Sequence, residues 1–354
     1  MTIDIHTLPE SERGTCPTEL GFGNHFSDHL FTQRYDEGKG WHDAAIKPFH
    51  NLTLHPAASV LHYGQEIFEG LKAYRRADGG VNLFRPEQNA LRFNRSAQRM
   101  VMPEVDISFH VEAIRQLVEI DDSWVPNQEG ASLYIRPAMI ATTPRLGLGA
   151  ATSYLHFVMA GPVGPYFKEG FNPVSVYVSD TCRRAVKGGV GEAKTGGNYA
   201  ASLYMSEQAA AKGFTQVLWL DAVEGRFIEE VGAMNICFVY DNQRIVTPTL
   251  TGSILAGITR DSILTLAPTL GYEIVEERLD INTVMNDIGT GKITEVFGCG
   301  TAAVISPVGR LCYRDADHTV NNMQAGPVAK RLFDELTAIQ YGRGGDSFGW
   351  VVEV

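Results

Sequence analysis

The stretch Gly161-Pro-Val-Gly-Pro-Tyr-Phe-Lys-Glu-Gly170 decides how this chain is divided. Glycine and proline at such density interrupt helices and strands, and they predict a connection between two folded parts. The chain has 354 residues, which is more than one ordinary hydrophobic core organises. We therefore expect a small N-terminal α/β domain over residues 1–160, an interdomain loop over 161–172 and a larger domain over 173–354.

Short strands and two helices are predicted on the N-terminal side of this connection. Ala77-Asp78-Gly79-Gly80 is a turn signal between two β-like runs, and it predicts a hairpin. Pro86 favours the first turn of a helix, and apolar residues follow it at helical spacing. Residues 1–20 are polar and predict a loose arm. The expected strands cover 71–75, 81–84, 132–141 and 154–160, and the expected helices begin at 86 and cover 110–120.

The C-terminal side mixes strands and helices without a regular repeat. No β-α-β rhythm requires a Rossmann sheet. The pattern therefore predicts an α+β or mixed α/β fold. The expected strands cover 174–178, 216–220, 227–240, 272–276 and 295–306, and the expected helices cover 200–212, 259–270 and 326–339.

The composition excludes several classes of protein. Hydrophobic residues make up 44% of the chain and charged residues 20%, which is the balance of a globular protein rather than a disordered one. The net charge of −11 disfavours binding to the phosphates of nucleic acids. The N-terminus has no apolar core, so we expect no signal peptide, and no apolar run approaches the roughly 20 residues of a membrane span.

The spacing of cysteines and histidines argues against disulfide and metal chemistry. The five cysteines are odd in number and no two are spaced as CxxC, so neither a disulfide framework nor a structural zinc site is expected. This usage fits a reducing cytoplasm. His25 and His29 have helical spacing, but no HExxH motif and no third ligand accompany them. We expect no metal site.

The segment Lys187-Gly-Gly-Val-Gly-Glu-Ala-Lys194-Thr-Gly-Gly-Asn-Tyr199 is the most unusual in the chain. Its glycines let the backbone approach a ligand closely. A phosphate-binding P-loop requires glycine before the lysine, where this chain has Ala193. Two alternatives remain. The segment is either a solvated surface loop, or it presents a lysine that loses its proton and attacks an aldehyde.

The second alternative favours Lys194 over Lys187. The chain has only nine lysines against 21 arginines, and only Lys194 is followed by Thr-Gly-Gly-Asn-Tyr. The hydroxyl of Tyr199 could donate a hydrogen bond to a phenolate beside an imine at Lys194.

Two adjacent acids, Glu229 and Glu230, precede an apolar run. Side chains alternate along a strand, so the two acids cannot share a face, and we expect one to be exposed and the other to point inward. A buried carboxylate is costly unless it is paired, and the protonated ring nitrogen of a ligand would pair it. The alternative is that both acids lie at an exposed strand end.

Two further segments are candidate anion sites. Gly257-Ile258-Thr259 precedes an apolar helix, and the unpaired N–H groups at a helix N-terminus attract anions. Gly300-Thr301-Ala302 interrupts a strand-like run and predicts a turn with exposed N–H groups. A helix end that binds only water, and a simple β-bulge, are the alternatives at these two places.

Together these segments resemble the branched-chain aminotransferases of the fold-type IV pyridoxal-phosphate enzymes. The resemblance runs from about Leu20 to the C-terminal region, in ordered blocks. The blocks are Leu-Gly-Phe-Gly at 20–23, Ile-Lys-Pro-Phe-His-Asn-Leu at 46–52, Leu-His-Tyr-Gly-Gln-Glu-Ile-Phe-Glu-Gly-Leu-Lys-Ala-Tyr at 61–74, Ser-Leu-Tyr-Ile-Arg-Pro at 132–137, Gly-Pro-Val-Gly-Pro-Tyr-Phe at 161–167, the Lys194 segment, Glu-Val-Gly-Ala-Met-Asn at 230–235 and the Gly-Cys-Gly-Thr-Ala turn at 298–302.

The resemblance implies a two-domain architecture, in which a small α/β domain accompanies a larger pseudo-barrel domain that binds pyridoxal 5'-phosphate. It implies that Lys194 is the Schiff-base lysine and proton carrier, and that Arg136 receives the side-chain carboxylate of glutamate. The other implied cofactor contacts are Arg95, Ile258, Thr259 and Thr301 for the phosphate, Tyr199 for the ring oxygen and Glu230 for the ring nitrogen. The other implied substrate contacts are Phe26, Tyr63 (from a second subunit), Phe68, Tyr134 and Met234, with the N–H groups of Thr301 and Ala302 for the α-carboxylate.

The implied reaction is a ping-pong transamination of leucine, isoleucine and valine with 2-oxoglutarate, which yields the 2-oxo acids and L-glutamate. The resemblance also implies a homodimer or higher homo-oligomer in the cytoplasm. Some relatives carry a redox CxxC just beyond the Gly-Thr-Ala turn, whereas this chain has Ala303-Val-Ile-Ser306 there, so no such thiol switch is expected. D-amino-acid aminotransferases and aminodeoxychorismate lyases are the nearest rivals, and the aromatic blocks around Tyr63, Phe68 and Tyr134–Arg136 argue against both. A pyridoxal-phosphate carrier without activity is the alternative outside enzymes.

Overall fold

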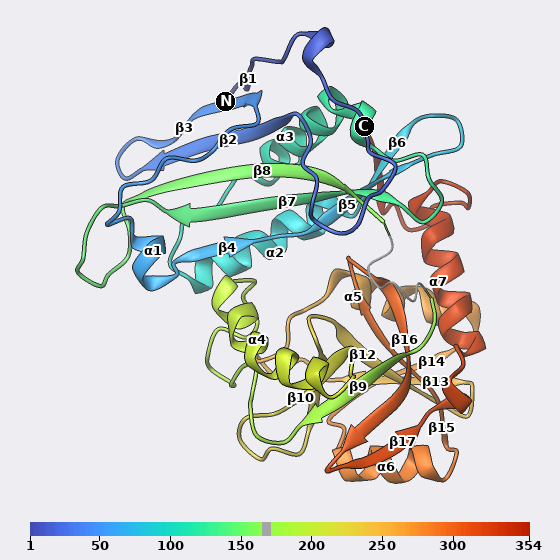
Figure 1. The fold of residues 1–354 in the computed structure, drawn as a ribbon. Helices are drawn as coiled ribbons and strands as arrows, with labels where there is room; N and C mark the ends of the chain where they lie inside the picture. Colours follow the sequence, from blue (N-terminus) through green and yellow to red (C-terminus); the bar gives the residue numbers. More distant parts are fainter. Residues whose placement is uncertain (165–170) are drawn as a thin grey trace. The chain divides into compact units, whose positions relative to one another are not determined.

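The computed structural model describes residues 1–164 and 171–354. The chain forms two compact units. Unit 1 comprises Met1–Tyr166, Ala193–Gly196 and Ala338–Val354, and unit 2 comprises Phe167–Glu192 and Gly197–Thr337. Both units combine a large sheet with helices (Figure 1), which confirms the predicted mixed fold.

Unit 1 is built on a mostly antiparallel sheet in the order β1-β3-β2-β8-β7-β5-β6-β18, with β4 paired to β7. Helices α2 and α3 pack on it, and both were predicted (Figure 1). The bounds are β1 Asp4–Ile5, β2 His29–Asp36, β3 Gly40–Pro48, α1 Ser59–Tyr63, β4 Glu66–Phe68, β5 Leu71–Arg75, β6 Val81–Phe84, α2 Pro86–Arg99, α3 Ile107–Ile120, β7 Ser132–Ala141, β8 Ser153–Val163 and β18 Val351–Glu353.

The core of unit 1 explains why these helices form where they do. Asp106 caps α3, since its carboxylate accepts a hydrogen bond from the N–H of Phe109. The buried stripe of α3, which includes Ile114 and Leu117, packs in one cluster with strand residues such as Leu133. Apolar residues at helical spacing therefore became the buried face, as the sequence predicted.

Three predicted boundaries of unit 1 differ from the structure. The arm is not wholly irregular, because β1 pairs in parallel with β3. Strand β8 extends to Val163, into the range expected to be interdomain loop, and residues 165–170 of that range lie outside the described residues. The C-terminal end, expected in the second domain, belongs to unit 1 because β18 pairs with β6, with Val352 opposite Leu83. A partner strand so distant in sequence leaves no local signal.

Unit 2 is built on a mixed sheet in the order β11-β10-β9-β16-β15-β12-β13-β14, with β17 paired to β16 (Figure 1). The predicted strand over 227–240 is two strands, β11 and β12, separated by a turn at 232–234. The bounds are β9 Val174–Ser179, α4 Gly196–Ala211, β10 Gln216–Leu220, β11 Ile228–Val231, β12 Asn235–Tyr240, β13 Arg244–Pro248, α5 Ile258–Leu266, β14 Glu273–Glu277, α6 Ile281–Gly289, β15 Ile293–Gly300, β16 Val304–Tyr313, β17 Ala316–Thr319 and α7 Pro327–Gln340.

The sheet of unit 2 is curled into a half-barrel. Strands β11 and β12 are separated by three residues in the chain, yet four other strands lie between them in the sheet. A bridge between Val231 and Met234 joins the end of β11 to the start of β12. A flat sheet cannot satisfy both facts, so the sheet curves until β11 returns towards β12.

Along residues 1–164 and 171–354, no helix has the length and apolar character that crossing a membrane would require.

Candidate active site

The backbone of Lys194 is held on both sides within unit 1. Its N–H donates to Ser96 Oγ at 2.9 Å, and its carbonyl accepts from the N–H of Phe68 at 2.9 Å. The Nζ lies 4.8 Å from the centroid of the Phe68 ring. The position of Lys194 is therefore fixed at its backbone, while its amino group lies over an aromatic face.

The residues that follow Lys194 are fixed by Glu66 on β4. The Glu66 carboxylate accepts from the N–H of Gly196, where α4 begins, and from Thr195 Oγ1 at 3.3 Å. Burial raises the pKa of Glu66, although these hydrogen bonds act against that rise. The sequence reasoning missed Glu66 and Ser96. Both lie inside quoted or helical stretches, but a contact with residues about a hundred or more positions away has no local signal.

Arg136 lies between two aromatic side chains of unit 1. It shares a face of β7 with Tyr134, and its Nη2 donates to the Tyr134 hydroxyl at 3.1 Å. Its Cζ lies 4.7 Å from the centroid of Phe68 and 5.3 Å from that of Tyr134. A guanidinium on aromatic faces is stabilised by cation–π attraction, so one positive group is held within an apolar wall.

A cavity of about 240 Å³ in unit 1 is lined in part by Phe26, Tyr134 and Arg136. Phe26 stacks on Phe49 with 5.3 Å between ring centroids. Gly161 on β8 lies opposite Tyr134 on β7. A Cβ at position 161 would lie only 2.0 Å from the carbonyl oxygen of His25. Glycine at 161 therefore lets the segment that carries Phe26 lie close to the sheet.

Two predicted residues of unit 1 are exposed. Arg95 lies on α2 with its side chain accessible to solvent. Tyr63 ends α1, is 41% exposed, and donates a hydrogen bond to the carbonyl of Leu146. Unit 1 thus brings together Lys194, Phe68 and the Tyr134–Arg136 pair, and it leaves Arg95 and Tyr63 at its surface.

Glu230 on β11 is a buried acid of unit 2 with defined partners. Its Oε2 lies 2.6 Å from Arg184 Nε, and its Oε1 accepts from the N–H of Leu255 at 3.1 Å and from Asn235 Nδ2 at 3.3 Å. Such an arrangement holds a carboxylate as a fixed negative charge. The roles of Arg184 and Asn235 were not predicted from the sequence. Arg184 lies just before the quoted Lys187–Tyr199 segment and Asn235 ends the quoted 230–235 block, but neither residue shows its role before the chain is folded.

The expectation that one of the adjacent acids is exposed was wrong. Glu229 and Glu230 are 5% and 4% exposed, because the curled sheet and the neighbouring loops cover both faces of β11. On the face of β11 opposite to Glu230, Glu229 accepts a hydrogen bond from Ser253 Oγ. Alternation along the strand was predicted correctly, but the burial of both faces was not.

Tyr199 and Glu230 contribute to one small cavity in unit 2, of about 20 Å³, which Arg184 and Asn198 also line. Tyr199 lies in the first turn of α4. The structure therefore places the predicted tyrosine and the predicted acid of unit 2 close together.

The predicted helix N-terminus at Ile258 is confirmed, because α5 begins there. Gly257 precedes it, and no side chain among the described residues caps the helix, so the first N–H groups of α5 point to a place where an anion can bind. A Cβ at position 257 would lie 2.0 Å from Asn235 Oδ1, which explains the glycine. Ile258 and Thr259 are both buried.

The predicted Gly-rich turn is also confirmed. Thr301 and Ala302 lie in the turn that joins the antiparallel strands β15 and β16, and both are partly exposed. Met234 packs against this hairpin, since a Cβ at Gly300 would meet its Cγ at 3.4 Å. Met234 and the turn therefore belong to one part of unit 2.

The donor groups of unit 2 fit pyridoxal 5'-phosphate. The buried Glu230 carboxylate suits a protonated ring nitrogen, the Tyr199 hydroxyl suits a ring oxygen, and the uncapped start of α5 suits a phosphate. Among the described residues, no group of three or more histidine, cysteine, aspartate or glutamate side chains is arranged to hold a metal ion.

Comparison with known proteins gives one consistent result. The model of the family "Amino-transferase class IV" matches residues 66–311. A "Probable branched-chain-amino-acid aminotransferase" of Streptomyces coelicolor is 52% identical to this chain, over 98% of this chain and 96% of its own length.

Solved structures agree with the sequence comparison. The branched-chain amino acid aminotransferase of Escherichia coli has a TM-score of 0.75 at 29% identity, and covers 90% of this chain and 98% of its own. The T.th. branched-chain amino acid aminotransferase, complexed with N-(5'-phosphopyridoxyl)-L-glutamate, has a TM-score of 0.74 at 27% identity. The match covers 91% of this chain and 97% of its own. The chain belongs to the class IV aminotransferases, and within them to the pyridoxal-phosphate-dependent branched-chain-amino-acid transaminases.

Proposed function

We propose that this enzyme transfers the amino group of leucine, isoleucine or valine to 2-oxoglutarate, with pyridoxal 5'-phosphate held by Lys194. The observation that carries the proposal is Arg136, whose guanidinium lies on the rings of Phe68 and Tyr134. A pocket that alternates between a branched apolar side chain and a carboxylate needs apolar walls and one cation. The solved relative that carries a phosphopyridoxyl-glutamate supports glutamate as the second amino acid.

Each proposed cofactor contact has its own chemical role. Lys194 supplies the amino group for the imine, Glu230 pairs with the ring nitrogen, and Tyr199 donates to the ring oxygen. The phosphate contacts are Arg95, Ile258, Thr259 and Thr301. When bound, the cofactor supplies an aldehyde carbon and a ring that accepts the electrons released at the substrate Cα.

The side chain of Lys194 moves the proton in the proposed reaction. With the cofactor and the amino acid bound, Lys194 Nζ would be the base that takes the proton from the substrate Cα. The hydrogen bonds with Ser96 and Phe68 hold the backbone of Lys194, and its four-carbon side chain is long enough to carry Nζ through this movement. Glu230 remains a fixed negative charge throughout, since Arg184, Asn235 and Leu255 hold it.

The proposed substrate contacts divide by chemistry. Phe26, Phe68, Tyr134 and Met234 provide apolar surface to a branched side chain. Arg136 binds the distal carboxylate of glutamate or 2-oxoglutarate. The N–H groups of Thr301 and Ala302 bind the α-carboxylate that all the substrates share.

An experiment on Arg136 tests the two-mode pocket. We expect all three branched-chain amino acids to be converted with 2-oxoglutarate, and a protein that only carries the cofactor would show no turnover. In Arg136→Met, KM for 2-oxoglutarate should rise at least about tenfold, since a charge-assisted hydrogen bond is lost. KM for leucine should change little. Equal rises for both substrates would contradict the assignment of Arg136.

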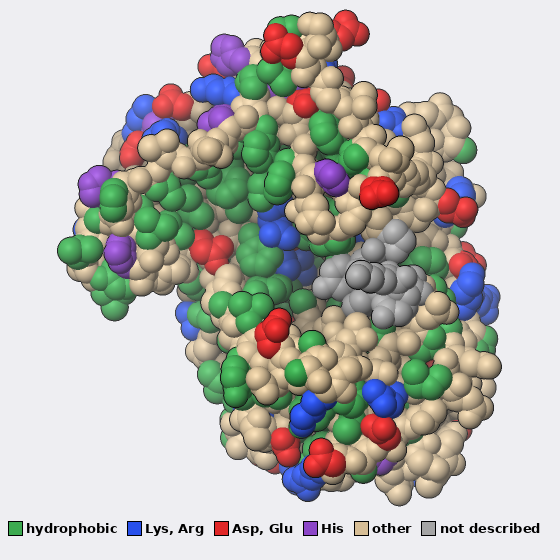
Figure 2. All heavy atoms as spheres, in the orientation of Figure 1, with side chains coloured by type: hydrophobic (Ala, Val, Ile, Leu, Met, Phe, Trp, Pro, Cys, Tyr) green, Lys and Arg blue, Asp and Glu red, His purple; other side chains and the backbone are tan. Residues whose placement is uncertain are grey.

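We further propose a cytoplasmic homodimer in which Tyr63 reaches the pocket of its partner. Leu61, Tyr63, Leu146 and Leu148 are 58%, 41%, 71% and 82% exposed, and apolar side chains exposed together favour association. Figure 2 shows hydrophobic side chains gathered over the part of unit 1 where Figure 1 places α1 and β4. All five cysteines are free, which suits a reducing compartment.

Mixing two inactive variants tests the shared site. A heterodimer of Lys194→Ala and Tyr63→Ala subunits has one site with both defects and one with neither, if Tyr63 acts across a two-fold interface. Activity should return when the two variants are unfolded and refolded together. Heterodimers that form without activity, or a fully active wild-type monomer, would contradict this role of Tyr63.

A further inference from the structure

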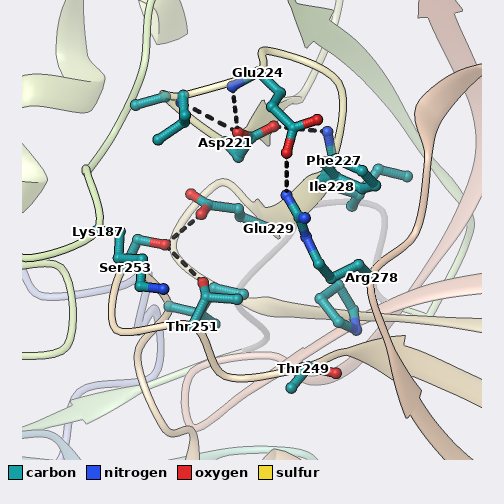
Figure 3. Close-up of a pocket in the computed structure, with 14 residues that line it drawn as sticks. Lys187, Asp221, Glu224, Phe227, Ile228, Glu229, Thr249, Thr251, Ser253 and Arg278 are labelled. Carbon is teal, nitrogen blue, oxygen red and sulfur yellow. Dashed lines mark hydrogen bonds and ion pairs between the residues drawn. The ribbon is translucent and has the colours of Figure 1, made fainter.

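Strand β11 presents Glu229 to a second cavity of unit 2, on the face opposite to Glu230. The cavity has a volume of about 290 Å³ (Figure 3). Figure 3 places the Glu229 side chain among the lining residues, with its carboxylate towards Ser253. Oε1 accepts from Ser253 Oγ, whereas Oε2 is buried and has no hydrogen-bond partner in the part of the chain that the structure describes.

A buried carboxylate oxygen without a partner is costly to the folded state. Glu229 is 5% exposed, and burial raises the pKa of its carboxyl group. Proteins satisfy nearly all buried polar atoms, so the exceptions call for a ligand or a partner. Glu229 lines this cavity and therefore brings to it a carboxylate with one oxygen that has no donor among the described residues.

The other charged groups around the cavity are already engaged or lie at its edge. The Asp221 carboxylate accepts from four backbone N–H groups of the loop that follows it. Glu224 pairs with Arg278 at 2.9 Å, and both are more than 40% exposed (Figure 3). With Lys187 the lining carries three acids and two bases, so its formal charge is negative when Glu229 is ionised. That balance favours a cationic ligand over an anionic one.

The remaining walls are apolar or carry hydroxyl groups. Phe227, Ile228 and Ile254 provide apolar surface, and the Thr251 and Ser253 hydroxyls lie 2.9 Å apart next to Glu229. The volume equals that of about ten water-sized groups. An ammonium group could donate to Glu229 and to a hydroxyl oxygen at once, while a short apolar body covers the walls.

We propose that this cavity is a second ligand site, which binds a small primary amine with its ammonium group on Glu229 and its apolar body against Phe227 and Ile254. The site goes beyond the proposed transamination. Amine binding at this site needs neither Lys194 nor the cofactor, so a failure of the amine site would leave the proposed function untouched, and the reverse.

Calorimetric titration with 3-methylbutylamine tests the site. The protein is the holoenzyme after borohydride reduction, so that the amine cannot exchange with the lysine at the cofactor. We expect one amine to bind per chain. The neutral analogue 3-methylbutan-1-ol should bind at least about tenfold more weakly, since it cannot form a charge-assisted hydrogen bond with Glu229.

Three variants locate the binding. Glu229→Gln should weaken amine binding at least about tenfold, while Glu224→Gln, which changes a rim acid already paired with Arg278, should stay within about threefold. Val223→Trp adds bulk at the rim on a residue that is 76% exposed, so it blocks the cavity without disturbing the core if Glu229→Gln fails to fold.

The outcomes separate the proposal from its rivals. Loss of binding in Glu229→Gln or in Val223→Trp, with binding retained in Glu224→Gln, supports the site. Equal binding of the amine and the alcohol, binding unchanged in both Glu229→Gln and Val223→Trp, or no binding of the amine at millimolar concentration overturns it.

Discussion

Glu229 and Glu230 are neighbours on β11, yet their carboxyl groups have different surroundings. Glu230 is paired with the Arg184 guanidinium and accepts two further hydrogen bonds. Glu229 accepts one hydrogen bond from a hydroxyl group, and its second oxygen has no partner among the described residues. Both are almost fully buried. The partners of a buried acid, rather than its residue type or its depth, therefore decide which role it can take.

The two acids are also linked to each other. Ser253 donates from its hydroxyl to Glu229 and accepts at its carbonyl from Arg184, which pairs with Glu230. A change at Glu229 therefore reaches Glu230 through two residues, so its effect on Glu230 should be weaker than a direct change.

Removal of Arg184 should have the largest effect on stability. Arg184→Met leaves Glu230 buried without its cation, so we expect a loss of about 3–5 kcal/mol in the free energy of unfolding. Arg183→Met is the matched control, because Arg183 donates to the backbone carbonyls of Ser179, Cys182 and Asp221 rather than to a carboxylate. Urea unfolding measures both. Equal losses of unfolding free energy in the two variants would show that the ion pair between Arg184 and Glu230 contributes no more to stability than the backbone contacts of Arg183.

Acid should destabilise unit 1 through its buried histidines. Burial lowers the pKa of His110 from 6.5 to about 4 and lowers that of His156, whose ring stacks on His110 with 5.0 Å between centroids. Between these pH values the unfolded chain binds a proton that the folded chain does not. The contribution of His110 is therefore fully present above pH 6.5 and is lost as the pH falls towards 4, by roughly 3 kcal/mol.

The His110→Phe variant checks this pH dependence. A phenyl ring suits the position, because His110 already stacks on Phe93 with 5.3 Å between centroids. Between pH 7 and pH 4.5 the variant should lose less unfolding free energy than the wild type. The same acid loss in both proteins would mean that His110 does not cause it.

Activity should separate the two acids directly. Glu230→Gln should retain the cofactor but lower kcat about a hundredfold, since an amide cannot stabilise a protonated ring nitrogen and a hydrogen bond to a charged group contributes roughly 1.5–3 kcal/mol. Glu229→Gln should stay within about threefold of the wild type, because it acts on Glu230 only through Ser253 and Arg184. Similar losses of kcat in both variants would contradict the assignment of Glu230, and not Glu229, to the cofactor.

The smallest effect concerns Glu229 and has the opposite sign to that of His110. Burial raises the pKa of Glu229 above 4.5, so its contribution to stability is fully present below pH 4.5 and is lost as the pH rises through the raised value. Glu229→Gln should remove that loss and raise stability at pH 7 by about 1 kcal/mol. Lower stability of the variant at pH 7 would show that ionised Glu229 is favourable.

Local patterns predicted most of the fold. The β5–β6 hairpin, helices α2 and α3 and the start of α5 follow from turn residues, proline and apolar spacing. The pairing of β18 with β6 was not predictable, because such a contact joins segments some 270 residues apart. The elements that were missed include β2 and β3 in unit 1 and β13 and α6 in unit 2.

The residues that fix the site were less predictable than those expected to act in it. The motifs named Lys194, Glu230 and Arg136 from their types and order. No motif identifies Glu66 or Arg184. Glu66 acts through its contact with Gly196 and Arg184 through its contact with Glu230, and both contacts exist only in the folded chain. The burial of Glu229 likewise follows from the curvature of the sheet, which alternation along β11 does not reveal.

Borohydride reduction followed by mass mapping of peptides tests the central claim most directly. Lys194 has two rivals, Lys187 on the same Gly-rich segment and the buried Lys72, whose pKa burial lowers to about 8. A lowered pKa favours imine formation, so Lys72 is a serious rival on chemical grounds. The account predicts a phosphopyridoxyl adduct on the peptide that contains Lys194, and none in Lys194→Ala. An adduct on Lys187 or Lys72, or one that persists in Lys194→Ala, would contradict it.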